Sequence, residues 1–532
     1  MAMRSGRYTA ATGENLAEGW TLQRLTAASR LFGANGLRTG PDGRIYVAQV
    51  SGSQVSAIDV ATGAVEAISA MGGDIVAPDD LVFDPHGNMY VTEITEGRVS
   101  VRAPNGVTRV IYGDMPVANP ITFHNGRLFA GECRIGGRIM ELDLDGGAPR
   151  IIATDVPMPN AFEVGPDGQL YVPVMGTNEI WRISLDGGKP EVVARDLGVP
   201  DSVKFDAAGR IVSTQVHSGQ VLRVDPRSGE KTVLAQLTPG LDNVTFVGQR
   251  MFVSNISGYV TEILDGGRTR DLVPDGFNWP LGLALDPDGL LYIADGPFSY
   301  TLRAGGTREL AGMLFTPGYP GYTRGVAAAG AGEFVVTTAM GMVARYWPAQ
   351  QKSEVIASGL DQQLYGVALT PRGGAVVVEQ GNGRVLSVAD GKIDVLASDL
   401  RQPSGVAVDG DGHCFVSEQA GGRVVKIAGG RVDTVLDGLR KPQGIAIRNG
   451  KLYVVDAGDK TLIECDTAGG ARRTIASGLP VGAPAGVTPK FLGAIGDMSG
   501  PMGPFAGITV AADGTLYVSG DADGSVLALR PA

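Results

Sequence analysis

Six oxygen-bearing side chains recur through the first half of the chain at steps of 39 to 45 residues. Each precedes a short run of alternating apolar residues. Carboxylate and amide oxygens are the ligands that a hard divalent cation takes, in sets of six to eight with water included. If folding gathers the six side chains, they could hold calcium, magnesium or another divalent cation. They are Asn35, Asp80, Asn119, Asn160, Asp201 and Asn243.

Any one of these residues also has a purely structural explanation. Asn and Asp begin turns by hydrogen bonding to nearby backbone. The second half of the chain supplies a contrast, because its corresponding positions carry no carboxylate. They are Leu281, Arg324, Tyr365, Ser404, Gln443 and Ala506. The sequence therefore predicts a metal site in the first half and none in the second.

The stretch 199–225 shows the element that positions these residues. Asp201 opens a short strand, 206–209 form a tight turn, and 210–216 form a second strand. After a turn at 217–219, a third strand follows over 220–224. Twelve copies recur along the chain, mostly 38 to 45 residues apart, which is the spacing of four-stranded propeller blades.

The repeat predicts an all-β protein of two six-bladed β-propellers in tandem, over residues 1–267 and 268–532. One continuous twelve-bladed ring is the alternative, which we disfavour because propellers typically have 4 to 8 blades. The last copy ends without an outer strand, and 21–25 is predicted to supply it. Residues 269–273 are predicted to do the same for a second ring. Inner strands converge on a channel, so the recurring polar residues should face one another at its mouth.

A histidine in the same repeat as Asp201 is the candidate acid or base. His217 lies between the second and third strands, so it should reach the same end of the blade. Imidazole titrates near neutral pH and suits general acid–base catalysis. The alternative is an exposed turn histidine. Glu93 and Glu132 end second strands nearby and would either support the amide ligands or serve the repeat structurally.

The first half resembles the calcium-dependent propeller hydrolases of the gluconolactonase/regucalcin family over roughly residues 30–265. That resemblance implies metal ligation by Asn119, Asn160 and Asp201, with Asp201 also activating water. The family's first ligand is a Glu, whereas this chain has Asn35 there; Asp80 would supply the missing charge. The second half resembles NHL-type repeats, in the phrases at 403–408 and 442–447.

The resemblance implies a calcium-dependent hydrolase that opens a lactone or similar cyclic ester, a small-molecule substrate. A propeller lyase that uses the same metal is the alternative within the enzymes. A non-catalytic propeller that binds a ligand or a protein is the alternative outside them. Fold alone does not choose among these functions.

The net charge, the apolar runs and the cysteine spacing limit the classes of partner and the cellular location that we expect. The net charge of −11 argues against a nucleic-acid binder, which needs basic surface to neutralise phosphates. No apolar run near the N-terminus is long enough for a signal peptide or membrane span, and the three cysteines are widely spaced. We therefore expect a cytoplasmic protein with no membrane partner, and the oligomeric state stays open.

One spacing departs from the repeat. Between Gln443 and Ala506 there are 63 positions, and the surplus lies in 480–505. A surface loop is the simpler interpretation, and a lid over the site is the functional alternative, because unusually long loops are often functional.

Overall fold

The computed structural model describes residues 7, 13–303 and 305–532. These residues form an all-β structure of twelve antiparallel sheets with two short 3₁₀ turns, η1 (Asp265–Gly267) and η2 (Pro348–Gln350). Eleven sheets have four strands and one has five. Within a sheet the strands follow chain order from one edge to the other, as in propeller blades, except that the N-terminal strands β1 (Asn15–Leu16) and β2 (Trp20–Arg24) form the outer edges of the last two sheets. No helix of the described residues is long and apolar enough to cross a membrane.

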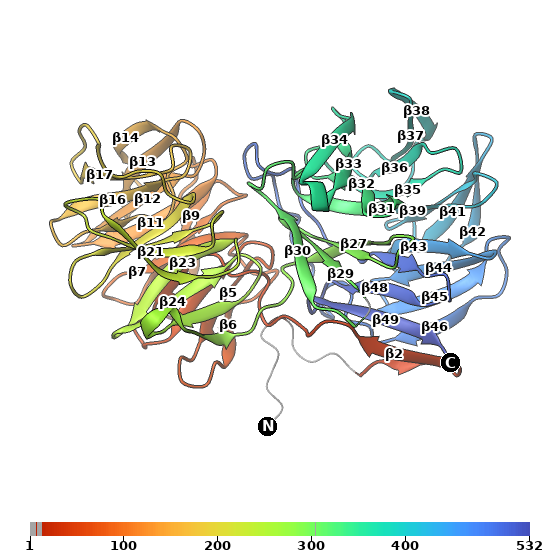
Figure 1. Ribbon diagram of the computed structural model, residues 1–532, viewed down its shortest axis with the longest axis horizontal. Helices are drawn as coiled ribbons and strands as arrows, with labels where there is room; N and C mark the ends of the chain where they lie inside the picture. The colour runs from red at the N-terminus through yellow and green to blue at the C-terminus, as the bar shows by residue number, and fades with distance from the viewer. Residues whose placement is uncertain (1–6, 8–12, 304) are drawn as a thin grey trace. The chain divides into compact units, whose positions relative to one another are not determined.

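The chain divides into two compact units (Figure 1). Unit 1 holds Arg7, residues 29–278 and residues 487–496, and contains six sheets. The strands of its sheets are β3 (Leu37–Thr39), β4 (Ile45–Gln49), β5 (Gln54–Ile58) and β6 (Val65–Ser69); β7 (Pro78–Phe83), β8 (Met89–Glu93), β9 (Arg98–Arg102) and β10 (Thr108–Tyr112); β11 (Ala118–His124), β12 (Arg127–Glu132), β13 (Gly137–Leu142) and β14 (Arg150–Val156); β15 (Glu163–Val164), β16 (Gln169–Val174), β17 (Glu179–Ser184) and β18 (Glu191–Ala194); β19 (Pro200–Phe205), β20 (Ile211–Gln215), β21 (Gln220–Val224) and β22 (Lys231–Gln236); β23 (Leu241–Val247), β24 (Arg250–Asn255), β25 (Val260–Ile263) and β26 (Thr269–Val273).

Unit 2 holds the described residues of 8–28, 279–486 and 497–532, and also contains six sheets. Their strands are β27 (Pro280–Leu285), β28 (Leu291–Asp295), β29 (Phe298–Leu302) and β30 (Arg308–Met313); β31 (Thr323–Gly330), β32 (Glu333–Thr338), β33 (Val343–Trp347) and β34 (Lys352–Ala357); β35 (Leu364–Leu369), β36 (Ala375–Glu379), β37 (Arg384–Ala389) and β38 (Lys392–Ala397); β39 (Pro403–Val408), β40 (Cys414–Glu418), β41 (Arg423–Ala428) and β42 (Arg431–Leu436); β43 (Pro442–Arg448), β44 (Lys451–Asp456), β45 (Thr461–Asp466), β46 (Arg473–Ser477) and β1 (Asn15–Leu16); β47 (Ile508–Val510), β48 (Leu516–Gly520), β49 (Ser525–Pro531) and β2 (Trp20–Arg24).

The N-terminal strand completes the last sheet, as the sequence predicts. Strand β2 pairs antiparallel with β49, from Trp20 opposite Pro531 to Arg24 opposite Leu527, and the two lie side by side in Figure 1. The prediction for 269–273 is wrong: β26 pairs with β25 as the outer strand of the sixth sheet of unit 1. The division between the units accordingly falls after Asn278, eleven residues beyond the predicted boundary at 267.

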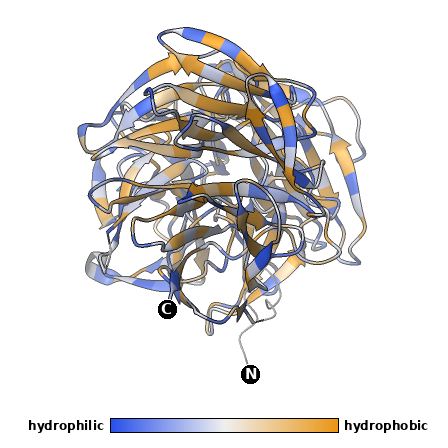
Figure 2. Cartoon of the chain, turned by 90° about the vertical axis from the view of Figure 1, so that its right-hand side faces the viewer, coloured by the Kyte–Doolittle hydropathy of each residue, from blue (hydrophilic) through white to orange (hydrophobic). Residues whose placement is uncertain are grey.

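Alternation along the strands builds the core between neighbouring sheets. At or just before the first strand of each sheet in unit 1, one apolar side chain is buried against the preceding sheet, and for the first sheet against the sixth; they are Leu37, Leu81, Ile121, Phe162, Val203 and Val244. Outer strands are the most exposed, with Val110, Ile151 and Val233 among the exposed apolar residues. Figure 2 shows orange apolar residues alternating with blue polar ones along several strands. Apolar clusters therefore hold neighbouring sheets together, whereas polar residues occupy the starts of the first strands.

Candidate metal centre

Strand register identifies which polar residue opens each first strand of unit 1. Pro78 pairs with Glu93, Pro200 with Gln215 and Leu241 with Asn255, each at the last residue of the second strand. The next residue in each case is a carboxylate. The matching residues of the six sheets are Asn35, Asp79, Asn119, Asn160, Asp201 and Asp242, which we call the mouth ring.

Four predicted residues thus occupy the mouth ring and two do not. Asn35, Asn119, Asn160 and Asp201 are in register, whereas Asp80 and Asn243 lie one residue further along their strands. The acids at the equivalent positions, Asp79 and Asp242, were missed by the sequence analysis. Each stands beside another polar residue, and a β-bulge follows directly, between residues 78 and 81 and between 241 and 244. A bulge breaks the two-residue alternation, so spacing alone cannot choose between neighbours.

The three carboxylates of the mouth ring are buried, and Asp242 raises the pKa of the other two. Burial, followed by repulsion from Asp242, raises the pKa of Asp201 well above its ordinary value, and Asp79 is raised likewise. Burial raises the pKa of Asp242 to about 7. The Cys133 thiol, also buried, has its pKa raised by burial and by these three carboxylates. The mouth of unit 1 is therefore a buried acidic site.

Amide side chains donate hydrogen bonds to two of these carboxylates. Asn160 Nδ2 donates to Asp201 Oδ2 at 3.1 Å, and Asn35 Nδ2 donates to Asp242 Oδ2 at 3.3 Å. Asp201 Oδ1 is buried without a hydrogen-bond partner among the described residues. An orphaned carboxylate oxygen beside two further acids and three amides is a donor set that fits an oxygen-loving divalent cation. The fourth amide-type candidate, Asn243, also has a buried Oδ1 with no partner in the described chain.

A second polar layer lies three residues further along the first strands. Arg38 Nη1 donates to Glu163 Oε2 at 2.6 Å, and Lys204 Nζ lies 2.9 Å from the same oxygen. Burial would raise the pKa of Glu163, but Lys204 and Arg38 lower it far below its ordinary range. Asp80 belongs to this layer electrostatically: burial raises its pKa, and Arg38 and Lys204 oppose the rise. Asp80 thus has cationic partners that the mouth-ring acids do not have.

Hydroxyls on the second strands fix the backbone of the mouth ring. Thr92 Oγ1 accepts from Asp80 N at 2.9 Å and donates to Asn119 O at 2.7 Å. Thr214 Oγ1 accepts from Ser202 N and donates to Asp242 O. Ser254 Oγ accepts from Asn243 N and donates to Asn35 O. Each hydroxyl therefore ties its own sheet to the ring residue of the next sheet. The Ser254 bond links the sixth sheet to the first, and their first strands, β23 and β3, are in contact.

His217 lies at the mouth end but apart from the acids. Its side chain is exposed, and its backbone N donates to Gly198 O at 3.1 Å. No hydrogen bond joins its ring to Asp201 within the described part of the chain. The catalytic role of His217 therefore stays a prediction.

Glu93 and Glu132 serve the repeat rather than the ring. Glu93 Oε2 accepts from Val76 N at 2.7 Å and pairs with Arg98 at 2.6 Å. Glu379 does the same in unit 2, where it accepts from Asp361 N at 2.9 Å and pairs with Arg384. Glu132 likewise pairs with two arginines, Arg134 and Arg138. The structural alternative is therefore the correct one for this position.

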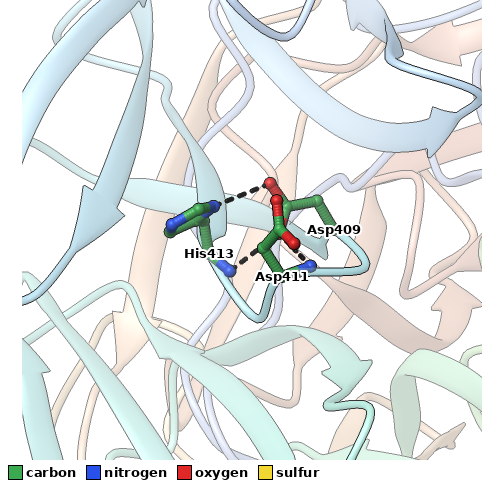
Figure 3. A group of neighbouring side chains, drawn as sticks. All are labelled: Asp409, Asp411 and His413. Carbon is green, nitrogen blue, oxygen red and sulfur yellow. Dashed lines mark hydrogen bonds and ion pairs between the residues drawn. The ribbon is translucent and has the colours of Figure 1, made fainter.

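A separate group of potential ligand atoms lies at 409–413. The ligand atoms of Asp409, Asp411 and His413 lie within 4.8 Å of one another (Figure 3). Asp409 Oδ1 accepts from the backbone of both other residues, and its Oδ2 lies 2.9 Å from His413 Nδ1. The same backbone pattern closes the turns at Asp84, Asp206 and Asp286. It is the turn chemistry of the repeat.

The corresponding ring of unit 2 has a different composition. Its positions hold Leu281, Arg324, Tyr365, Ser404, Gln443 and Ala506, as the sequence analysis placed them, and every one is followed by glycine. A cavity of about 30 Å³ lies beneath them, lined by these glycines, by the apolar residues after them and by Phe505. This mouth has no carboxylate, so it lacks the charged oxygen ligands that a divalent cation takes.

The surplus loop contributes to unit 1. Residues 487–496 group with unit 1, and Leu492 and Ile495 are buried there. Gly493 and Gly496 pack so closely on Thr95 and Val117 that an added Cβ would lie 3.1 and 3.0 Å from them. Both neighbours lie in loops at the mouth end of the second and third sheets. This segment therefore packs on loops at the mouth end of unit 1.

Comparison with known proteins singles out the half that carries the mouth ring. Residues 7–257 match the SMP-30/gluconolactonase/LRE-like region family. The match includes all six mouth-ring residues and ends before strand β25. No curated protein matches the chain.

Solved structures of similar shape each cover about half of the chain. A streptogramin B lyase is 18% identical and covers 52% of this chain and 97% of its own, with a TM-score of 0.39. Virginiamycin B lyase from Staphylococcus aureus is 16% identical over 52% and 96%, and a proposed gluconolactonase is 17% identical over 49% and 96%, both with TM-scores of 0.39. Scores this low carry no argument, so the fold rests on the twelve sheets and the site on its own residues.

Proposed function

We propose that this protein is a hydrolase that depends on a divalent cation held by the mouth ring of unit 1 and that opens a lactone or similar cyclic ester. The observation that carries the proposal is the buried set of Asp79, Asp201 and Asp242, whose pKa values are raised and whose charge has no cationic side chain within 4.0 Å among the described residues. The family match over residues 7–257 supports it. Calcium is the first candidate cation, and magnesium the second.

The mouth ring would hold the cation through its three carboxylates and three amides. When bound, the cation would supply Lewis-acid polarisation of a carbonyl oxygen. Residues of the chain would orient the carboxylates and support the backbone of the mouth ring. Asn35 and Asn160 orient the carboxylates, and the hydroxyls of Thr214 and Ser254 hold the backbone beneath them.

Asp201 is the proposed proton acceptor for the attacking water. Its Oδ1 has no hydrogen-bond partner among the residues that the structure describes, and a raised pKa makes a carboxylate a stronger base once it is ionised. His217 is the proposed second acid or base, because it lies at the same end of the same sheet. The loop segment 487–496 would limit which substrates reach the mouth.

We also infer that each unit is a closed six-bladed ring. Six sheets fall in each unit, and the first strands of its first and last sheets are in contact: β3 with β23, and β27 with β47. A twelve-bladed ring would instead place β23 beside β27. The cytoplasmic location and a small-molecule partner remain predictions.

The test is a panel of lactones and aryl esters assayed with calcium, with magnesium and with EDTA. We expect hydrolysis that EDTA abolishes and that Asp201→Asn reduces at least about 100-fold. Reaction in ¹⁸O-labelled water separates the enzyme classes: a hydrolase places the label in the product acid, whereas a lyase product carries none. Turnover that is the same in EDTA would contradict the proposal.

A further inference from the structure

Unit 2 buries an arginine at its mouth. Arg324 occupies the second ring position of this unit and is 2% exposed. Its Nη1 donates to Gln362 O at 2.7 Å, and its guanidinium lies 4.9 Å from the ring centre of Tyr365, the next ring residue. Its Nη2 is buried without a hydrogen-bond partner in the described chain. One edge of the guanidinium is therefore unsatisfied.

The charge of Arg324 also lacks a counter-ion. Nearby arginines of the same unit each pair with a carboxylate: Arg345 with Glu333, Arg384 with Glu379, and Arg423 with Glu418. No carboxylate of the described residues lies within 4.0 Å of Arg324, although Asp361 is near enough to act on it electrostatically. A guanidinium keeps its charge in proteins, and burying an unpaired charge is costly.

The neighbouring ring residues are neutral hydrogen-bonding groups. Gln443 Nε2 donates to Gln419 Oε1 at 3.0 Å, and Gln380 Nε2 donates to Ser404 Oγ at 3.0 Å. Gln443 Oε1 accepts from Ala506 N at 2.8 Å, and its Nε2 also lies 3.4 Å from Pro504 O, so the hydrogen-bonding groups of Gln443 are engaged within the protein. None of these neutral side chains repels an oxyanion by charge. The mouth of unit 2 is thus cationic and polar, whereas the mouth of unit 1 is acidic.

We propose that the mouth of unit 2 binds a small oxyanion, a carboxylate or a phosphate group, with Arg324 Nη2 as the charged donor. Tyr365 holds the guanidinium in place by its ring contact. The inference concerns unit 2 alone and stands whether or not unit 1 holds a metal.

Calorimetric titration of the full-length protein tests this, with acetate and inorganic phosphate as separate probes at constant ionic strength and with EDTA present. We expect saturable binding of at least one probe, and a tenfold or greater loss of affinity in Arg324→Gln. Arg324→Lys keeps the charge but not the planar donor edge, so it should retain an intermediate affinity. The probe that binds shows whether carboxylate or phosphate is the preferred group.

Arg345→Gln is the matched control, because Arg345 lies in the same sheet but already has Glu333. It should bind the probe like the wild type. Far-UV circular dichroism and melting confirm that each variant is folded, and if Arg324→Gln does not fold, Arg324→Lys decides. Absence of binding by either probe to the wild type, or unchanged affinity in a folded Arg324 variant, would overturn the proposal.

Discussion

At the scale of single residues, the account depends on which member of two polar pairs faces the mouth. The pairs Asp79–Asp80 and Asp242–Asn243 look equivalent in the sequence, and the register separates them. Asp80 has Arg38 and Lys204 as electrostatic partners, whereas Asp79 is raised in pKa by burial and by Asp242. Asp79 and Asp242 are the members of these two pairs that lie in the mouth ring, and a bound cation would stabilise their charges.

Removing a mouth-ring charge should weaken cation binding. We expect Asp79→Asn and Asp242→Asn each to lower calcium affinity about tenfold or more, because affinity follows the number of ligand charges. Asp84→Asn is the control, because it removes the charge of a turn carboxylate in the same sheet as Asp79, and it should change the affinity little. Calorimetry on the three proteins measures the difference. Equal affinity in Asp242→Asn and the wild type would remove Asp242 from the site.

Raised carboxylate pKa values also predict a pH effect without divalent cations. The pKa of Asp242 is about 7 in the folded protein against an ordinary value of 3.8, so the folded state binds the proton more tightly. The free energy of unfolding should therefore be highest below pH 4 and fall as pH rises towards 7, by on the order of 4 kcal/mol for this group. Asp79 and Asp201 act in the same direction.

Comparison of the wild type with Asp242→Asn isolates this contribution. In EDTA, the variant should gain stability relative to the wild type between pH 5 and pH 8. Calcium should stabilise the wild type most at pH 8, because the ligands must be deprotonated. Melting curves at both pH values test this; a variant whose relative stability does not change with pH would contradict the assigned shift.

At the scale of elements, the strands were predictable and the bulged starts of the first strands were not. The repeat spacing and the turn glycines predict four-stranded sheets, and β2 pairs with β49 as expected. The hydroxyls on the second strands, such as Thr92 and Thr214, were a signal present in the sequence but unused. Each lies one residue before the end of its second strand, where Glu93 and Gln215 stand. Each donates to the backbone carbonyl of a mouth-ring residue in the next sheet.

Removing one of these hydroxyls should affect the site as well as the sheet. Thr214→Val leaves Asp242 O and Ser202 N without their partner, which should cost about 1–3 kcal/mol of stability. Calcium affinity should fall with it. Thr337→Val is the matched control, because Thr337 makes the same two bonds in unit 2, to Gly325 N and Tyr365 O. A Thr337→Val protein that loses calcium affinity equally would show that the effect is global.

The segment 487–496 should govern substrate access. Leu492 is 2% exposed, so Leu492→Ala opens space where the segment packs on the mouth end of unit 1. We expect KM to rise about tenfold with kcat little changed, which indicates lost substrate binding. Met502, buried in the part of the loop that groups with unit 2, supplies the control Met502→Ala. Equal kinetics in the Leu492 and Met502 variants would argue against a lid.

At the scale of the whole molecule, two units of similar architecture carry mouths of opposite character. The sequence analysis predicted this asymmetry, because the first half has acids and amides and the second has none of the acids. The sequence could not predict that 487–496 groups with unit 1, because this segment joins the fold through contacts far apart in the sequence. Nor could it show that Arg324 is buried without a carboxylate partner within 4.0 Å among the described residues.

The most direct test of the metal site is calorimetric titration of the EDTA-treated full-length protein with calcium. The account predicts one binding site per chain in the wild type and none in a variant that combines Asp79→Asn, Asp201→Asn and Asp242→Asn. A wild type that binds neither calcium nor magnesium, or a triple variant that is folded and binds as the wild type does, would contradict it.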